Sequence, residues 1–342
     1  MLQILCRTDR KWVNVLSYMT LLLLAGCQLL GYVDSQAKVT ANELDLPPAH
    51  YETVAWLNDD EIAFTYRQPD EREGTTRVAL FNVVTGQLED IILPPQREDC
   101  FPVASWINRL SRLSNGNLAY TYFCMENPGG LAGELYEWDR ENRATNQLIR
   151  YPDFGPGDFS MSPDMTEVLQ ENPVGAILSN ELHRFEIGGE GQRILADFKR
   201  ASGPSWAPDG RSFIFVGTKS TPFDSPETFE DVEGLALSPW TIYEISADQT
   251  ELRELVSGVN RVILQWSPDG NKIAFAGEYR DRSGIWLLDK DSGEVSLIWP
   301  YSTPFDWSPD GRSMVILPGE NNGPFSSSHN TYPTIVDLEN LD

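Results

Sequence analysis

Basic residues, histidines and cysteines are scarce in this chain, and each scarcity narrows the functions open to it. The 342 residues include 26 Lys and Arg against 51 Asp and Glu, which gives a formal net charge of −25. Nucleic-acid affinity depends on cationic side chains that neutralise phosphates, so the composition excludes nucleic acid as a partner. With three histidines and four cysteines, the chain offers few of the usual nitrogen and sulfur ligands of metals. We therefore expect no metal and no cofactor.

Catalytic motifs are also missing. A serine hydrolase would need a Gly-x-Ser-x-Gly nucleophile motif, and the sequence does not contain one. His50, His183 and His329 are widely separated, and we interpret them as surface residues; a general base among the three is the alternative. The sequence therefore predicts no catalytic residue.

Long hydrophobic runs are lacking, and the clearest apolar run lies near the start. Trp12 to Leu24 follows the basic residues Arg7, Arg10 and Lys11. The run is too short to span a bilayer comfortably as a helix. A basic start followed by a short apolar run is typical of an export signal. A transmembrane helix and an ordinary secretory signal are the alternatives.

The four residues that close this run, Leu24 to Cys27, resemble the lipobox of bacterial lipoproteins. The resemblance implies that Cys27 is lipidated and becomes the first residue of the mature protein. We expect residues 1–26 to be the signal peptide, 27–48 a flexible tether and 49–342 one domain. The protein is then an exported, membrane-anchored lipoprotein. Its expected location is the outer membrane or periplasm of a Gram-negative cell, and otherwise the outer face of the plasma membrane.

Two cysteines remain for the body of the exported protein, Cys100 and Cys124. A pair of cysteines in an oxidising compartment indicates a disulfide. It would close a loop of about 24 residues and stabilise the fold by about 3 kcal/mol on the chain-entropy model. A metal site is the alternative, although neither cysteine has a histidine nearby in the sequence.

A short motif recurs along the chain. Three segments share the pattern Trp-x-Pro-Asp-Gly, and each is followed by an apolar strand. A fourth copy has Met165 in place of Gly, and two more are degenerate. The copies are Ser205–Gly210, Gln265–Gly270, Asp306–Gly311, Met161–Asp164, Trp56–Asp60 and Ser114–Gly116. The spacing of roughly 50 residues is the length of one four-stranded propeller blade with variable loops.

The chemistry of the motif predicts a tight turn between two strands. Pro presets φ, Asp bonds its own backbone and Gly accepts a positive φ. Trp can wedge between adjacent blades. We therefore interpret the motif residues as structural. They are Trp206, Asp209, Gly210, Trp266, Asp269, Gly270, Trp307, Asp310, Gly311 and, from the fourth copy, Asp164.

These repeats resemble the WD-like repeats of TolB-type β-propellers. The resemblance implies an all-β, six-bladed propeller over most of the mature chain, and seven blades remain an alternative. The sixth unit is short at its C-terminal end. We expect a strand from before Trp56, around Glu43–Leu46 or Glu52–Ala55, to complete it, because closure removes two free sheet edges.

The resemblance also bears on function. TolB acts as a scaffold that contacts other envelope proteins, so we predict a monomeric, non-catalytic binding protein whose partner is an envelope protein or peptide. The insertion Thr218–Pro239 is the best candidate contact surface, with Phe223, Phe229 and Asp231 as contact residues; disorder is the alternative. The alternative function is a propeller-type enzyme acting on a carbohydrate or small substrate in the central funnel. A structural lipoprotein with no ligand is a third hypothesis.

Overall fold

Antiparallel β-strands form all of the regular structure in the described part of the protein. The computed structural model describes residues 39–68, 76–92, 100–126, 130–149, 157–174, 179–195, 197–198, 200–219, 240–317 and 332–338. These residues contain 23 strands and no helix. All of them belong to one unit, Ala37–Asp342.

Three sheets are four-stranded meanders in chain order. The first contains β2 (His50–Asn58), β3 (Glu61–Arg67), β4 (Arg77–Asn82) and β5 (Leu88–Ile92). The second contains β6 (Cys100–Arg112), β7 (Leu118–Glu126), β8 (Gly130–Asp139) and β9 (Ala144–Ile149). The third contains β10 (Phe159–Met161), β11 (Glu167–Val174), β12 (Ser179–Glu186) and β13 (Gly191–Ile194).

A seven-stranded sheet joins two further meanders through one long strand. Its strands are β14 (Arg200–Trp206), β15 (Ser212–Thr218), β16 (Trp240–Ser246), β17 (Leu252–Trp266), β18 (Lys272–Tyr279), β19 (Arg282–Asp289) and β20 (Val295–Trp299). The first half of β17 pairs with β16, and the second half pairs with β18. The strand is therefore the outer strand of one meander and the inner strand of the next.

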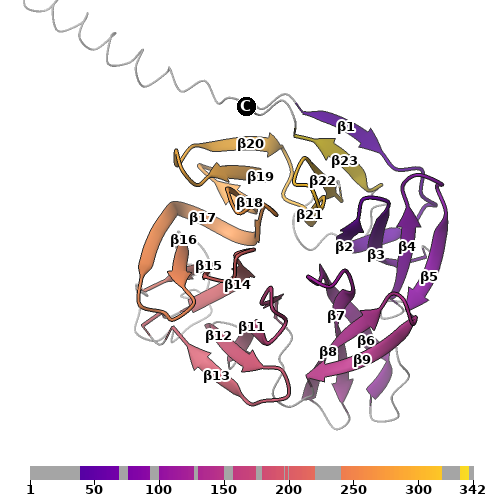
Figure 1. The fold of residues 1–342 in the computed structure, drawn as a ribbon, viewed down its shortest axis with the longest axis horizontal. Helices are drawn as coiled ribbons and strands as arrows, with labels where there is room; N and C mark the ends of the chain where they lie inside the picture. The colour runs from indigo at the N-terminus through magenta and orange to yellow at the C-terminus, as the bar shows by residue number, and fades with distance from the viewer. Residues whose placement is uncertain are drawn as a thin grey trace, which may run out of the picture. The chain divides into compact units, whose positions relative to one another are not determined.

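The last sheet joins the two ends of the folded unit. Its order is β1-β23-β22-β21. The strands are β1 (Thr40–Glu43), β21 (Phe305–Trp307), β22 (Ser313–Ile316) and β23 (Thr334–Asp337). Figure 1 shows the sheets following one another around a common axis, with β2, β14 and β21 near that axis and β5, β13 and β20 at the outside. This is the arrangement of a β-propeller.

A strand from before Trp56 completes the last sheet, as expected, and it lies three residues earlier than the expected segment Glu43–Leu46. It is Thr40–Glu43, which pairs antiparallel with β23, while residues 50–58 form β2 of the first sheet. All four residues of β1 are exposed, so no apolar alternation marks the strand in the sequence. Backbone pairing holds it, and Leu44 N donates to Pro333 O beside it at 2.9 Å. The strand also lies inside 27–48, the range predicted as a tether.

The repeated motif forms the turn between the first two strands of a four-stranded meander. In the copy at Gln265–Gly270, Gly270 has φ of 73° and donates to Ser267 O at 2.9 Å. Asp269 Oδ1 accepts from Ser267 Oγ at 2.5 Å and from Asn271 N at 3.1 Å. The Asp side chain therefore fixes the turn, and glycine supplies the positive φ that other residues adopt only with strain.

Neighbouring turns touch one another around the axis. A Cβ atom placed on the glycine of one motif would lie in contact with Cδ of the proline of the preceding motif. The distances are 3.7 Å for Gly210 to Pro163, 3.8 Å for Gly270 to Pro208 and 3.4 Å for Gly311 to Pro268. The motif thus shapes its own turn and also packs one sheet against the next.

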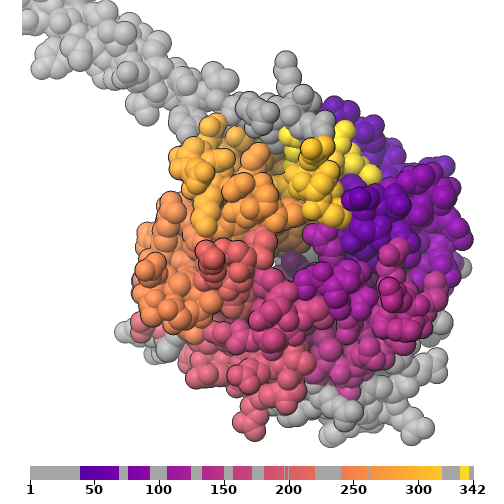
Figure 2. Space-filling model, viewed as in Figure 1, coloured from indigo at the N-terminus to yellow at the C-terminus, as the bar shows by residue number. Residues whose placement is uncertain are grey.

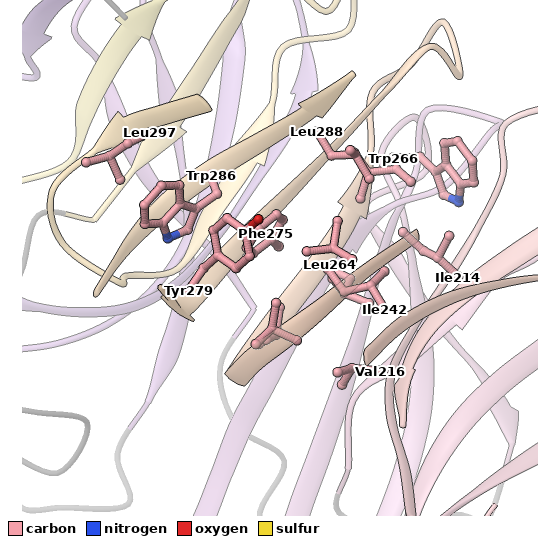
Figure 3. Close-up of a cluster of buried hydrophobic side chains, with 14 of the residues drawn as sticks. Ile214, Val216, Ile242, Leu264, Trp266, Phe275, Tyr279, Trp286, Leu288 and Leu297 are labelled. Atoms are coloured by element: carbon pink, nitrogen blue, oxygen red, sulfur yellow. The ribbon is translucent and has the colours of Figure 1, made fainter. Parts of the chain in front are cut away.

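The core lies between the sheets. The second strand of a meander is buried on both faces, as in β18, whose Ile273, Ala274 and Phe275 are fully buried. Figure 3 shows the rings of Phe275, Tyr279 and Trp286 packed together within the seven-stranded sheet, and Tyr279 meets Trp286 edge-on at a centroid distance of 5.2 Å. Burial on both faces explains why these strands are continuously apolar in the sequence.

Removing the closing strand should destabilise the ring. We predict that a variant starting at Asp45 unfolds with a free energy about 2–4 kcal/mol lower than one starting at Ala37, because the backbone hydrogen bonds of β1 are lost. The newly exposed edge of β23 should also cause concentration-dependent association. Thermal unfolding and sedimentation of the two variants measure both effects. Equal stability would show that β1 does not hold the ring closed.

Candidate functional site

A cavity of about 450 Å³ lies on the propeller axis, where inner strands end at their motif turns. We call it the axial pocket. Figure 2 shows the depression that it occupies at the centre of the ring. Inner strands β6, β10, β14, β17 and β21 and their following turns supply most of the lining. The lining residues are Leu57, Arg109, Ser111, Arg112, Leu113, Ser114, Gly116, Phe159, Ser160, Met161, Ser162, Pro163, Pro204, Ser205, Trp206, Pro208, Gln265, Trp266, Pro268, Asp306 and Trp307.

The repeated motif contributes its apolar residues to this lining. Trp206, Trp266 and Trp307 line the pocket, although each is at least 94% buried. The motif carboxylates and glycines, which were interpreted as structural, are not among the lining residues. Hydrogen bonds from Ser308 Oγ and Arg312 N hold the pKa of Asp310 below its ordinary value. This carboxylate is thus occupied within its own turn.

The residue that precedes the motif Trp reaches the neighbouring sheet. Ser160 Oγ, in the third sheet, accepts from Trp206 N at 2.9 Å. Gln265 Nε2, on β17, donates to Phe305 O of the last sheet at 3.3 Å. A polar side chain at this position therefore satisfies a backbone group of the next inner strand. The axis of the propeller is held by polar contacts as well as by apolar packing.

Asp306 occupies the same position in the last sheet and joins it to the first. Its Oδ2 atom accepts from Trp56 N at 2.7 Å. Burial raises the pKa of Asp306, while the hydrogen bond from Trp56 and the positive charges of Arg112 and Arg109 oppose that rise. The carboxylate therefore performs a structural task at the closure of the ring, next to the two guanidinium groups of the pocket.

A second buried carboxylate lies beside the pocket wall. Glu171 Oε2 accepts from Ser202 Oγ at 2.7 Å and from Gly203 N at 3.1 Å. Arg109 of the lining approaches Asp158, with 3.3 Å between Nη1 and Oδ1. Burial, followed by the negative charge of Asp158, raises the pKa of Glu171 to about 7. This cluster connects strands β6, β11 and β14.

An irregularity in the backbone of β14 allows a backbone amide to donate a hydrogen bond to Glu171. The register of β14 against β15 shifts between Ser202 and Ser205. Gly203 lies in that irregularity with φ of 59°, a conformation that glycine adopts without strain. The irregularity leaves Gly203 N available to donate to the carboxylate instead of pairing within the sheet.

The axial pocket is more basic than the protein as a whole. Its charged lining residues are Arg109, Arg112 and Asp306, whereas the chain has almost twice as many acidic as basic residues. No group of three or more His, Cys, Asp or Glu side chains arranged to hold a metal occurs among the described residues. The pocket therefore offers guanidinium and hydroxyl groups to a ligand, whereas its tryptophans are almost wholly buried.

Several residues singled out from the sequence lie outside the described residues. They are Cys27, Phe223, Phe229, Asp231 and His329. Of the other two histidines, His50 begins β2, and His183 lies in β12 with Nε2 3.5 Å from Glu181 Oε2. Neither belongs to the axial pocket.

The two cysteines proposed to pair lie on adjacent strands of one sheet. Cys124, in β7, is fully buried. Cys100 begins β6, and the pairing places it opposite Glu126, while Cys124 lies opposite Ser105. The disulfide between them stays a prediction.

The sequence reasoning missed the charged groups of the axis. Asp306 falls inside a recognised repeat, but the motif gives it no role. Arg109 and Arg112 precede the degenerate second copy, where the pattern is weakest. The signal that could have found Arg112 is its position: it pairs with Leu118 as Trp206 pairs with Phe213.

No helix long and apolar enough to cross a membrane was found in the part of the chain that the structure describes.

Solved structures of similar fold identify the architecture. TolB from Acinetobacter baumannii matches with a TM-score of 0.56 and 17% identity, over 82% of this chain and 64% of that one. A putative TolB from Agrobacterium tumefaciens matches at 0.52 and 14%, over 87% and 98% of the two chains. An oligogalacturonate lyase in complex with manganese matches at 0.53 and 13%, over 90% and 95%. No protein-family model and no curated protein matches the sequence. The likenesses show a TolB-like β-propeller fold.

Glu171 should make stability depend on pH. Its pKa of about 7 lies above the ordinary value of 4.5, so the folded protein holds this proton more tightly than the unfolded chain. The contribution of Glu171 to the free energy of unfolding is therefore largest below pH 4.5 and falls as the pH rises towards 7. We predict that Glu171→Gln, which keeps an acceptor for Ser202 and Gly203, raises the melting temperature at pH 8. The gain should shrink as the pH falls towards 4.5.

The exposed Glu251 provides the matched control, because Glu251→Gln should leave the melting temperature unchanged across the same pH range. Thermal unfolding monitored by circular dichroism measures both variants. A Glu171→Gln variant that is less stable than the wild type at pH 8 would contradict a buried charge at this position.

The cysteine pair gives a separate prediction. If Cys100 and Cys124 are joined, the oxidised protein should react with a thiol reagent at neither position, and Cys124→Ser should release the thiol of Cys100. The loss of the cross-link should lower the free energy of unfolding by about 3 kcal/mol. Mass spectrometry of the denatured, alkylated protein counts the free thiols. Two alkylated cysteines in the oxidised wild type would rule the disulfide out.

Proposed function

We propose that this protein is a lipid-anchored, extracytoplasmic six-bladed propeller that binds an envelope protein or peptide at its axial pocket without catalysing a reaction. The observation that carries the proposal is the pocket itself, a cavity of about 450 Å³ with tryptophan, proline, serine and arginine in its lining. Ligand pockets in proteins commonly have volumes of about 300–1,000 Å³.

The six-blade count rests on the long strand β17. Four sheets of the structure have four strands, and the fifth has seven. Because β17 pairs with β16 through its first half and β18 through its second, it serves two meanders. Counting this sheet as two blades gives six four-stranded units, one for each motif copy found in the sequence.

The composition of the pocket favours recognition of a peptide. Tryptophan and arginine are enriched at the residues that contribute most to protein–protein binding. Trp206, Trp266 and Trp307 form an almost wholly buried apolar wall, while Arg109 and Arg112 supply hydrogen-bond donors. A peptide inserted at the mouth would bury its side chains against the indoles and pair its carbonyl groups with arginine and serine.

The carboxylates of the axis support a binding role over catalysis. Glycoside hydrolysis uses two carboxyl groups flanking the bond that breaks, and a metal site needs several converging ligands. The described lining contains one carboxylate, Asp306. That group is occupied by Trp56 N at the closure of the ring. Its contribution is therefore structural.

The anchor and location follow from the N-terminal segment. We propose that Cys27 carries the lipid and that residues 1–26 are removed on export. With a net charge of −25, the protein gains nothing from the negative surface of a membrane, so acyl chains are the means of attachment. The body then faces the periplasm or the outer surface of the cell.

Site-specific crosslinking in the native cell tests this proposal. A photoreactive amino acid placed at Ser114, an exposed residue of the pocket lining, should form a discrete adduct with an envelope protein or peptide. The same residue at Thr85, exposed in the turn between β4 and β5, provides the control. We expect Cys27→Ser to move the protein from the membrane fraction to the soluble fraction.

Adducts that form equally at both positions, or at neither, would contradict binding through the axial pocket. Retention of the Cys27→Ser variant in the membrane fraction would contradict the lipid anchor. Each half of the proposal therefore fails independently of the other.

A further inference from the structure

The second sheet departs from the others at one position of the inner strand. In the three complete copies of the motif, the Trp pairs with the third residue after the turn. The pairs are Trp206 with Phe213, Trp266 with Ile273, and Trp307 with Met314. In the third sheet, the equivalent residue is Met161, opposite Val168. In the second sheet, the equivalent residue is Arg112, opposite Leu118. A guanidinium group thus replaces an apolar wedge.

This replacement changes the chemistry of the axial pocket. Arg112 lines the cavity together with Trp206, Trp266 and Trp307. Arg109 lies on the same strand, β6, and lines the cavity as well. Two cations therefore come from one blade, while aromatic rings come from the blades of the seven-stranded sheet and the last sheet. The lining has one cationic side and one apolar side.

Three carboxylates lie near these arginines, and two of them also accept hydrogen bonds from other groups. Asp306 Oδ2 accepts from Trp56 N at 2.7 Å, and Glu171 Oε2 accepts from Ser202 Oγ and Gly203 N. Asp158 pairs with Arg109 at 3.3 Å but does not line the pocket. The lining itself carries two guanidinium groups and one carboxylate, with Asp158 behind it beside Arg109. The net positive charge of the lining favours an anion.

We infer that the axial pocket binds a carboxylate group of a peptide ligand, with Arg112 as the principal contact and Arg109 as the second. The inference rests on the proposed function and names the chemistry that this pocket selects. Arginine suits this task because its planar donors match the two oxygens of a carboxylate. Peptide residues next to the carboxylate would pack against Trp206 and Trp266.

A pair of probes that differ only in charge tests the inference. The peptide N-acetyl-Ala-Ala-Asp-amide carries the carboxylate, and N-acetyl-Ala-Ala-Asn-amide has the same shape without it. We expect the full-length wild-type protein to bind the Asp peptide at least about tenfold more tightly than the Asn peptide, because hydrogen bonds to a charged group are strong. Calorimetry measures the affinities.

Arg112→Met is the decisive variant, because Met161 shows that this register position accepts methionine. It should remove the preference for Asp over Asn, so that the two peptides bind with similar affinity. Arg112→Lys, which keeps the charge but not the planar donor geometry, should retain a reduced preference. Arg143→Met, at an exposed position that pairs with Glu89, is the matched control and should keep the full preference.

Equal binding of the Asp and Asn peptides by the wild type, or an unchanged preference in Arg112→Met, would overturn the inference. Saturable binding of galacturonate in place of the Asp peptide would also overturn it, since the carboxylate would then come from a sugar acid. The crosslink at Ser114 distinguishes a failure of the carboxylate contact from a failure of the proposed function. An adduct that persists in Arg112→Met with a wild-type yield leaves the proposed function standing and rejects the carboxylate contact.

Discussion

The packing of one inner strand against the next is the constraint on which this structure depends. A four-stranded sheet buried on both faces is stable only when both neighbours are present. The motif turns lie close enough to provide that contact, because a Cβ atom placed on Gly311 would lie 3.4 Å from Cδ of Pro268 in the preceding copy. The last contact must join the two ends of the chain. Asp306 bonding to Trp56 N at the axis and β1 pairing with β23 at the outside provide it.

This way of closing the ring explains the character of the candidate site. Inner strands converge on the axis, and their unpaired backbone groups need polar partners there. Ser160, Gln265 and Asp306 provide such partners. Polar and charged side chains therefore gather on the axis of a largely apolar body, and the space that they leave is the axial pocket. A buried carboxylate such as Glu171 remains tolerable because Ser202 and Gly203 satisfy it.

The sequence predicts the fold better than the site, for physical reasons. The turn motif and the apolar second strands depend on local conformation and burial, and both produce repeating patterns in the sequence. The strand β1 produces none, because its four residues are exposed and only their backbone matters. The polar cluster of Arg109, Asp158 and Glu171 combines residues of different blades, so no local sequence pattern predicts it. Arg112 is visible only when its register is compared with that of the tryptophans.

We propose the axial pocket as the point of contact with a partner in the envelope. A structure of the protein bound to a partner isolated from its native membrane tests that proposal most directly. We predict that the partner enters the pocket, with an acidic group beside Arg112 and apolar atoms against Trp266. A partner seated on the outer edge strands β5 or β13, with the axial pocket empty, would contradict it.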